Sequence, residues 1–473
     1  MPQISKTFSV FDCDAHVNDP LDIWNKYVPE SKKELVRQTY WRDDNRGLLN
    51  GDLPVVGGGN GEFAPMYNPI CIAGPQMSKR IMRKLMTMMP LSDAQRDYLE
   101  HKGSRDPDAR VHEMDLMGID QVLVIPTMTI WNLPFAENIA GAIAYCEAYN
   151  NWVSDWCRQQ PERLYPAAIL PLQSPADAAN EVRRVARKGF PVVLMRPIDA
   201  MGHYPNDIDS VAMNFGATPP TYDILFRAIE ENGMVLGVHT FPANSFGRPG
   251  APGQLTSPGE LITQAGADSQ TLSFIYEAQT WLAQVLLAGF LDRYPKLKMA
   301  IFESNAQWLP YLLETSDRLF KLYANERERS AKRLPSEAFY SQCIIAFESD
   351  EEPMMRQWDR FENIGIWSSD CYHHDAADAW SAIRRMRRHE VPEEVQAKLM
   401  GGNARRFYNI EPKLFVTEEP PPITRPDWFP AEAELETWSQ IVANPRRNRD
   451  QMRKMGLDPA RFLPPQPDIS SVR

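Results

Sequence analysis

The chain has 473 residues, a net charge of −11, 43% hydrophobic residues and 24% charged residues. This composition is that of a globular protein, and the negative balance argues against a general nucleic-acid binder. No apolar run reaches the roughly 18 residues that a membrane span needs, the start "MPQISKTFSV" lacks the apolar core of a signal peptide, and the six cysteines show no CxxC spacing. We therefore expect a cytoplasmic protein with free thiols, no membrane span and no nucleic-acid partner.

Short apolar runs, rich in β-branched residues, recur along the chain with helical patterns between them. The runs are nearly continuous rather than alternating, which is typical of parallel strands that are covered on both faces. We expect eight strands, at residues 8–16, 120–126, 164–172, 191–197, 234–240, 297–304, 343–349 and 364–370.

The segments between these runs carry helix signals. Ser174 is a suitable N-cap for a helix that ends at Gly189, and further helical patterns cover 305–329 and 375–389. Eight alternations of strand and helix predict an α/β fold, a (β/α)8 TIM barrel. A doubly wound open sheet is the alternative, but no Gly-rich dinucleotide turn is present.

Two insertions and a tail lie outside this pattern. We expect the barrel to occupy 1–415, with lid-like insertions at about 40–110 and 241–270, and a Pro-rich C-terminal extension at 416–473. A basic, Met-rich stretch at 77–90 in the first insertion is suited to hold the phosphates of a coenzyme A ester, or is simply a surface helix with a buried apolar stripe.

The first strand, "FDCDAHVNDP", places Asp12, Asp14 and His16 at every second position. Strict alternation would point these three side chains to one face and Phe11 and Cys13 to the other. Ionisable groups on a buried strand need compensation, and a metal ion is the usual partner of a carboxylate and an imidazole at this spacing.

Other strand ends supply similar groups, and in a barrel of this kind the working residues lie at the carboxyl ends of the strands. Taken singly, such an Asp is more often a helix cap and such a His a structural residue. Together they predict a metal site, because four of the eight histidines fall at strand ends. The candidates beyond the first strand are Arg196, His239, Glu303, Glu348, Asp370, His373 and His374.

Aromatic residues also gather near the strand ends. They would suit an apolar pocket at the mouth, although each of them alone is as easily explained by packing under a loop. They are Trp131, Phe135, Phe241, Phe246, Trp308, Trp367 and Tyr372.

Several motifs together resemble one family. The chain is similar to the amidohydrolase-related superfamily, in the branch of aminocarboxymuconate-semialdehyde decarboxylase-like enzymes. The matching stretches are "DCDAHVNDP", "GVHT", "PKLKMAIFESNAQWLPYLLE", "CIIAFESDEE", "WSSDCYHHD" and "GGNARRFYNI". They span nearly all of 1–410, and the last 60 or so residues lie outside the resemblance.

The resemblance implies that Asp14, His16, His239 and Asp370 ligate one metal ion. Asp14 stands where the family pattern has the first histidine of H-x-H, and relatives of the decarboxylase type also use an acid there. The fourth strand ends in "VVLMRP" without a lysine, so the two-zinc hydrolase pattern is not supported.

Glu303, Glu348 and His373 exceed what one ion needs, and two interpretations remain. They orient the ligands of a single zinc or manganese ion, in a hydrolase or a non-oxidative decarboxylase of a small carboxylic acid. Alternatively, Glu303 and His373 join the ligands of two iron ions, because an oxygen-rich set suits iron or manganese.

The second interpretation is narrowly preferred at this stage. In fold, length and carboxylate-rich site the chain also resembles the TIM-barrel non-haem diiron monooxygenase group of platensimycin-type diterpenoid antibiotic biosynthesis. That resemblance implies an oxidoreductase that uses O2 to hydroxylate an apolar diterpenoid or CoA-linked substrate, with an electron donor. Glu348 and Asp370 are the predicted catalytic residues, and we expect a homo-oligomer.

Overall fold

The structure is a computed structural model, which describes residues 2–17, 23–40, 102–127, 138–197, 222–240, 267–326, 331–373 and 376–421, with isolated shorter pieces between 49 and 95, at 129, 130 and 133, and between 426 and 456. Most of the two predicted insertions, including the basic stretch at 77–90, lies outside the described residues, as do His374 and most of the C-terminal extension. The predicted boundary at about 415 stays a prediction.

Eight parallel strands form the predicted barrel. All of them lie inside the ranges that the sequence predicted, apart from the last residue of β1. Each predicted strand is observed, as β1 (Phe11–Val17), β4 (Gln121–Pro126), β5 (Leu164–Ile169), β6 (Val192–Met195), β7 (Val235–His239), β8 (Lys298–Phe302), β9 (Cys343–Phe347) and β10 (Gly365–Trp367). They pair in chain order from β1 to β10, which confirms the TIM-barrel prediction over the open sheet.

The barrel closes between the first and the last strand. Ala15 forms an isolated parallel bridge with Cys371, and the Asp370 backbone N–H donates to the Asp14 carbonyl at 3.1 Å. The His16 backbone N–H also donates to the Cys371 carbonyl. These contacts bring the loop after β10 against the end of β1, at the mouth of the barrel.

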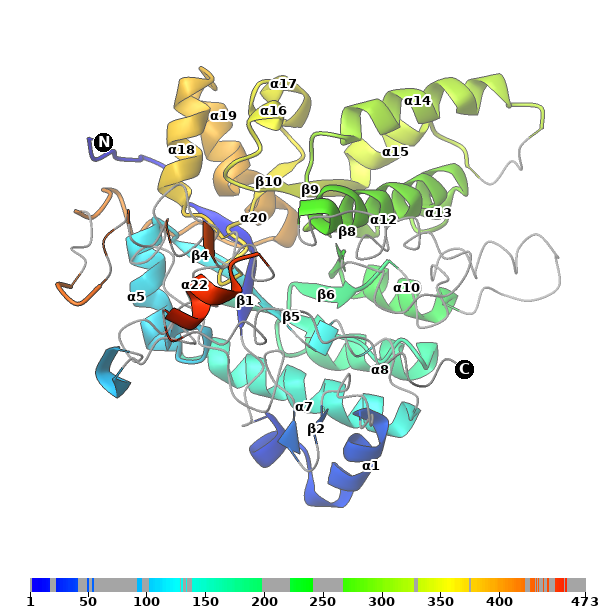
Figure 1. The fold of residues 1–473 in the computed structure, drawn as a ribbon. Coiled ribbons are helices and arrows are strands. Elements are labelled where there is room, and N and C mark those ends of the chain that lie inside the picture. The colour runs from blue at the N-terminus through cyan, green and yellow to red at the C-terminus, as the bar shows by residue number, and fades with distance from the viewer. Residues whose placement is uncertain are drawn as a thin grey trace.

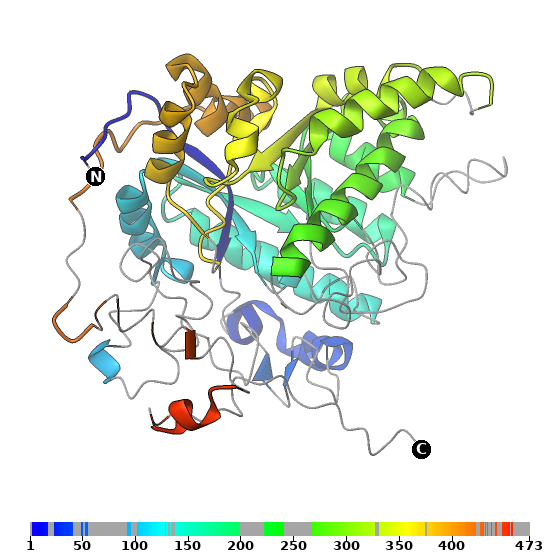
Figure 2. The ribbon, with the colours of Figure 1, turned by 45° about the horizontal axis from the view of Figure 1, so that its top comes forward.

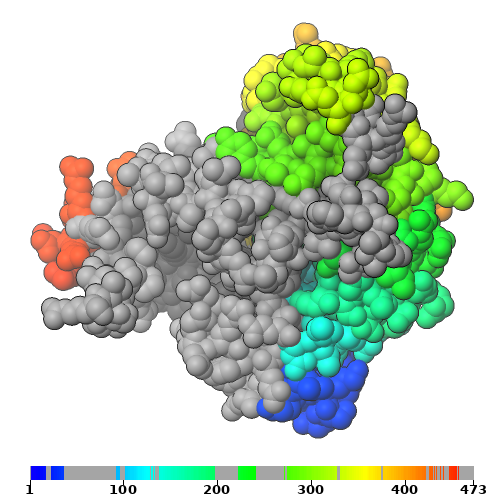
Figure 3. All heavy atoms as spheres, turned by 90° about the vertical axis from the view of Figure 1, so that its right-hand side faces the viewer, coloured from blue at the N-terminus to red at the C-terminus, as the bar shows by residue number. Residues whose placement is uncertain are grey.

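Helices surround the strands, as Figure 1 shows with α7 and α8 below the sheet, α12 to α15 on the right and α18 to α20 above. Figure 2 shows the same outer layer from a second direction. In Figure 3 the colours run from yellow-green to blue down one face, so successive units of the chain are neighbours in space.

The helices are α1 (Glu30–Tyr40), α5 (Pro107–Met117), α7 (Ile139–Cys157), α8 (Pro175–Ala186), α10 (Asp223–Glu231), α12 (Ala267–Leu287), α13 (Phe290–Arg293), α14 (Leu309–Leu322), α15 (Pro335–Gln342), α16 (Glu352–Met355), α17 (Trp358–Phe361), α18 (Ala379–Arg388), α19 (Glu393–Ala397), α20 (Asn403–Tyr408) and α22 (Arg449–Lys454). A small hairpin consists of β2 (Leu49–Asn50) and β3 (Leu53–Pro54).

The helix boundaries follow the signals in the sequence. Ser174 caps α8 by accepting a hydrogen bond from the Asp177 N–H, as predicted. Asp378 caps α18 in the same way through the Ser381 N–H. Asp106 caps α5 through the Ala109 N–H, and Pro107 fills the first helical position. Local caps therefore set where these three helices begin.

Two apolar clusters make up the core. One fills the inside of the barrel with side chains from alternate positions of the strands, such as Leu123, Leu194 and Phe302, and also includes Ala404 and Tyr408 of α20. The larger one lies between the strands and the helices. The strand ends are thereby held rigidly, and the polar side chains beyond them start from fixed positions.

The first strand departs from strict alternation. Phe11 and Cys13 belong to the cluster inside the barrel, whereas Ala15 and Val17 belong to the outer one. The register against β4 shifts between Asp12 and Ala15, which is a β-bulge. The prediction that Asp12 shares a face with Asp14 and His16 is therefore wrong, because the bulge turns the last two toward the mouth and leaves Asp12 beside β10.

Candidate metal centre

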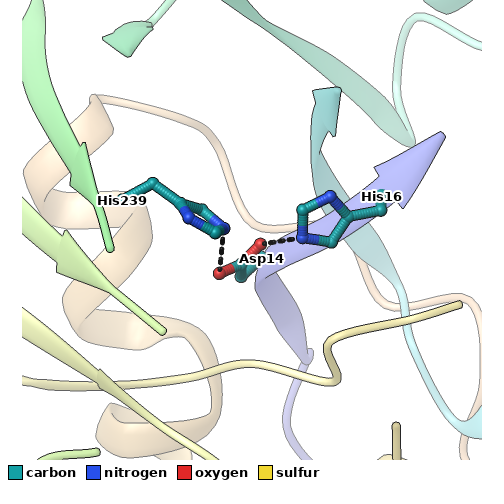
Figure 4. A group of neighbouring side chains, drawn as sticks. All are labelled: Asp14, His16 and His239. Carbon is teal, nitrogen blue, oxygen red and sulfur yellow. Dashed lines mark ion pairs between the residues drawn. The ribbon is translucent and has the colours of Figure 1, made fainter. Parts of the chain in front are cut away.

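Three buried side chains from two distant strands converge at the mouth. Asp14 and His16 come from β1 and His239 ends β7, and none is more than 1% exposed. Figure 4 shows the Asp14 carboxylate between the two imidazoles. Asp14 Oδ1 lies 3.2 Å from His16 Nε2, and Asp14 Oδ2 lies 3.5 Å from His239 Nε2.

The loop after β10 adds a fourth and a fifth side chain. Asp370 Oδ1 lies 3.4 Å from His16 Nε2 and 2.8 Å from His373 Nδ1. The His373 ring stacks on the His16 ring with centroids 4.0 Å apart, and its side chain is 20% exposed. His373 therefore lies at the solvent side of the centre, whereas Asp370 is buried within it.

Backbone carbonyls fix the direction of both strand-borne imidazoles. His16 Nδ1 lies 3.1 Å from the Pro126 carbonyl, and His239 Nδ1 lies 2.8 Å from the Thr240 carbonyl. A ring that donates from Nδ1 presents Nε2 as the coordinating nitrogen. Both Nε2 atoms consequently face the same small volume.

The distances fit the ligands of one ion. At bond lengths of about 2.1 Å, adjacent ligand atoms around one ion lie about 3.0 to 3.4 Å apart, depending on the geometry. The contacts of Asp14 and His16 fall in or near this range. Moreover, Asp14 Oδ1 and His16 Nε2 make no hydrogen bond of normal geometry within the part of the chain that the structure describes. Burial makes such atoms costly, and a cation would satisfy both.

Interactions within the centre favour the charged forms of Asp14, His16 and Asp370. Burial alone would raise the pKa of Asp14, but His239 and His16 outweigh it and lower that pKa to about 2. Burial alone would lower the pKa of His16, but Asp14 and Asp370 outweigh it and raise that pKa to about 10. The pKa of Asp370 is lowered, because His373 and His16 outweigh the effect of burial. A divalent ion would meet two carboxylates that are already ionised.

Glu303 lies behind His239 rather than beside the other ligand atoms. Its Oε2 atom is 3.4 Å from His239 Nδ1, on the side of the ring that points away from Asp14. Its backbone has φ 47°, in the left-handed region that is strained for a non-glycine residue. Asp370, with φ 52°, shares this feature, and such strain at strand ends is typical of functional sites.

Among the described residues, Glu348 is not a member of the two groups of candidate ligands, which are Asp14–His16–His239 and His16–Asp370–His373. Its side chain is half-buried, and its backbone N–H donates to Glu351 Oε1 at 3.0 Å. Alternation from Ala346 of the inner cluster places Glu348 on the face toward the barrel axis. Its predicted catalytic role stays a prediction.

Two acids outside the predicted ligand set, Asp12 and Glu351, hold the strand ends. Asp12 accepts hydrogen bonds from the backbone N–H and the hydroxyl of Ser369, at 2.9 and 2.6 Å, and thus fixes the residue before Asp370. Glu351 accepts from the backbone N–H groups of Ala306 and Glu348 and so joins the loops after β8 and β9. Burial raises the pKa of each acid to about 7.

Arg110 on α5 is a third supporting residue, which the sequence analysis did not name, as it did not name Glu351. It is buried and donates to the carbonyl of His16 and, at 2.7 Å, to that of Gly103. Its guanidinium also lies 4.5 Å from the centre of the Tyr372 ring. The signal for Arg110 and Glu351 was weak, because a charged residue within a helix or a loop is usually exposed.

The aromatic residues predicted near the mouth divide into two groups. Trp308, Trp367 and Tyr372 belong to the core between strands and helices, where Trp367 donates to the Ser349 hydroxyl at 3.1 Å. These three pack under the loops. The other four, Trp131, Phe135, Phe241 and Phe246, lie outside the described residues.

Comparison with protein families identifies the chain. The family model described as "Amidohydrolase" matches residues 101–410, which is more than half of the sequence. The chain belongs to the amidohydrolase family. This membership confirms the family that the motifs indicated, and it makes the chain a member of a family of enzymes.

Solved structures share the fold at low sequence identity. An amidohydrolase from Mycobacterium avium subsp. paratuberculosis K-10 is 19% identical with a TM-score of 0.60, and the match covers 85% of this chain and 99% of the other. A 5-carboxyvanillate decarboxylase from Novosphingobium aromaticivorans, complexed with manganese and 4-hydroxy-3-methoxy-5-nitrobenzoic acid, is 18% identical with a TM-score of 0.55, covering 86% and 99%. A 2,6-dihydroxybenzoate decarboxylase from Rhizobium is 16% identical with a TM-score of 0.52, covering 85% and 99%. The decarboxylases among these neighbours agree with the branch that the motifs indicated.

No helix in the described part of the chain has the length and apolarity of a membrane span. The cytoplasmic location, the homo-oligomer and the absence of a nucleic-acid partner stay predictions.

Proposed function

We propose that this amidohydrolase holds one divalent metal ion with Asp14, His16, His239 and Asp370 and removes CO2 from a small carboxylic acid without oxidation. The observation that carries the proposal is the convergence of Asp14 Oδ1 and His16 Nε2, two buried atoms 3.2 Å apart that lack a normal hydrogen bond among the described residues. Hydrolysis by the same centre is the alternative reaction.

Manganese is the ion we favour, with zinc as the alternative. Two carboxylates and two imidazoles form an oxygen- and nitrogen-donor set, which suits manganese at least as well as zinc. A decarboxylase of the same fold has been solved with manganese, which supports this choice. When bound, the ion supplies a cationic centre that polarises the substrate carboxyl group.

The side chains around the ion take distinct roles. The carbonyls of Pro126 and Thr240 hold the imidazoles of His16 and His239 in place, and Glu303 fixes His239 from behind. His373 is the best-placed proton donor, because Nδ1 contacts Asp370 and the ring lies at the solvent side. Decarboxylation breaks one C–C bond, releases CO2 and leaves a carbon that needs a proton, which His373 Nε2 would deliver.

The geometry does not favour the two-iron interpretation. Two triads of ligand atoms are present among the described residues, Asp14–His16–His239 and His16–Asp370–His373. Both contain His16, whose Nδ1 is engaged by the Pro126 carbonyl, so only Nε2 remains to coordinate and it serves one ion. Glu303, which a second iron would need, lies behind His239. The fold neighbours likewise favour decarboxylation over oxygenation, and the diterpenoid or CoA-linked substrate and the electron donor have no support.

Metal counting and product analysis test the proposal together. Purified protein loaded with manganese should contain one ion per chain and release CO2 from small carboxylic acids equally well in air and under argon. Benzoic acids with hydroxyl groups are a suitable first panel, since the fold neighbours include decarboxylases of such acids. Two iron ions per chain with oxygen uptake, or hydrolysis of esters without CO2 release, would reject decarboxylation.

A further inference from the structure

Arg110 of α5 lies against the seam where the first and the last strand of the barrel close. The residue is 1% exposed. Its guanidinium donates to the backbone carbonyl of His16, a proposed metal ligand, and its Nε atom donates to the Gly103 carbonyl at 2.7 Å. The same guanidinium lies over the Tyr372 ring, 4.5 Å from the ring centroid. One side chain thus contacts both β1 and the loop after β10.

These contacts form a closed circuit across the seam. Both backbone groups of His16 belong to it, because the carbonyl accepts from Arg110 and the N–H donates to the Cys371 carbonyl. Tyr372 directly follows Cys371 and leads the circuit back to the guanidinium. The next residue is His373, the proposed proton donor. The position of Tyr372 therefore sets where the backbone of His373 begins.

The surroundings of this contact are tightly packed. A Cβ atom at Gly103 would clash with Tyr372 Oη, so the backbone of the turn at Lys102–Ser104 touches that side chain closely. The Trp156 ring centroid lies 5.7 Å from the guanidinium of Arg110. A planar guanidinium stacks on a ring and donates in its own plane at the same time, which the ammonium group of a lysine does not do.

The metal ligands have anchors that do not involve Arg110. Asp12 fixes the start of the loop after β10 through Ser369, at 2.9 and 2.6 Å. The imidazole of His16 is fixed by the Pro126 carbonyl, 3.1 Å from Nδ1. Loss of the arginine should therefore leave the ligands able to hold an ion and should displace mainly the residues that follow Cys371.

We infer that Arg110 is a positioning residue for proton transfer, because it holds Tyr372 against the end of β1 and so keeps His373 in place beside the ion. The inference rests on the function proposed above, in which His373 delivers the proton. A group that transfers a proton must lie within hydrogen-bond reach of its target, and a misplacement of about 1 Å can cost about 100-fold in rate. Loss of Arg110 should thus slow turnover and leave substrate and metal binding unchanged.

Arg163 offers a matched control at the other end of the barrel. It is also buried, donates to the Asp120 and Ile119 carbonyls at 2.7 and 2.8 Å, and lies 4.4 Å from the Phe415 ring centroid. Asp120 and Arg163 directly precede β4 and β5, so these contacts lie at the amino ends of the strands. Arg163 also pairs with Asp115 at 2.7 Å, so its loss should cost at least as much stability as loss of Arg110.

Steady-state kinetics on the manganese-loaded protein are the first test. The assay follows CO2 release from an acid that the wild type decarboxylates. Arg110→Met should lower kcat about 10- to 100-fold, with KM and manganese content unchanged. Arg110→Lys should recover only part of kcat, because it retains the charge without the planar stack. Arg163→Met should leave kcat unchanged. An equal fall of kcat in Arg110→Met and Arg163→Met, or loss of manganese from Arg110→Met, would overturn the inference.

Hydrogen exchange supplies a second readout that needs no substrate. The His373 N–H donates to the Asp370 carbonyl at 2.8 Å, so protection of residues 369–373 reports on the order of the loop. In Arg110→Met these residues should exchange at least about tenfold faster than in the wild type, and in Arg163→Met they should exchange at the wild-type rate.

Tyr372 tests the other half of the contact. Tyr372→Phe keeps the ring and should exchange like the wild type, whereas Tyr372→Leu should behave as Arg110→Met does and serves where that variant impairs folding. Unchanged exchange in both Arg110→Met and Tyr372→Leu overturns the inference. If the wild type releases CO2 from no acid while the exchange pattern is as expected, the proposed function falls but the hold of Arg110 on the loop stands.

Discussion

The mouth of the barrel has two halves with the same architecture and opposite contents. The ends of β1, β7 and β10 carry Asp14, His16, His239 and Asp370, all buried and charged or polar. The ends of β5 and β6, together with the segment after β4, surround a small aliphatic cavity that also borders Arg196. The barrel thus fixes where side chains begin, and the residue types decide whether the space takes a cation or is filled by apolar packing. Substitutions in the first half should therefore lower metal binding, whereas substitutions in the second half should lower the stability of the fold.

The largest effect is expected from His239→Ala. Removing one of four ligands should abolish stoichiometric manganese binding and lower turnover at least about 1,000-fold, because an ion of this kind contributes several kcal/mol to the reaction. Metal content per chain and CO2 release measure the two effects. The matched control is His112→Ala, an exposed histidine on α5, which should change neither.

The apolar half should respond in stability rather than in metal content. Leu170 is 2% exposed, so Leu170→Ala should lower the free energy of unfolding by about 2 to 5 kcal/mol through lost contacts and a cavity. Manganese should stay at one ion per chain. Leu414→Ala is the control, since that leucine is 46% exposed. Loss of the ion in Leu170→Ala would mean that the two halves are not independent.

A smaller effect in the metal half should follow from Asp12→Asn. The amide retains only one of the two oxygens that accept from Ser369, so the loop that carries Asp370 loses its anchor. Manganese affinity should fall about 10- to 100-fold, as is typical when a partner behind a metal ligand is lost. Asp106→Asn offers a matched control, because Asp106 caps α5 and asparagine caps a helix as well as aspartate does. Unchanged affinity in Asp12→Asn would contradict the anchoring role.

The smallest expected effect is the release of protons when manganese binds to the metal-free protein. Asp14 and Asp370 outweigh burial and raise the pKa of His16 to about 10, so the metal-free protein carries an imidazolium at neutral pH. Binding of manganese to Nε2 should then release about one proton per ion near neutral pH, and the release should fall toward zero above about pH 10. Titration of metal-free protein in unbuffered solution measures it. No release near neutral pH would show that His16 is neutral before the ion binds.

Most of the fold was predictable because its signals are local. Eight apolar runs with helical patterns between them specify the barrel, and Ser174 marks the start of α8 at the predicted residue. Several predicted strands were too long at their carboxyl ends, because residues such as Glu303 and Asp370 already adopt positive φ. Residue types and strand ends alone could not reveal this turn of the backbone.

The site was predictable in its members and less so in their arrangement. Asp14, His16, His239 and Asp370 follow from their places at strand ends and from the family motifs. The positions of Glu303 and Asp12 depend on how the chain packs around them. The sequence shows that acids lie near the mouth, but it does not show which of them face the proposed ion and which contact only a neighbouring residue. Arg196 was found, but its pairing with Glu277 joins segments 81 residues apart.

The extra residue in β1 decides which side chains of the strand face the barrel axis beyond Asp12. If the same residues paired with β4 without the bulge, strict alternation would turn Asp14 and His16 into the helix layer and would place the methyl group of Ala15 toward the barrel axis. One irregular step in β1 therefore decides which of its side chains can meet a cation, while the pairing of the later strands shows no such shift.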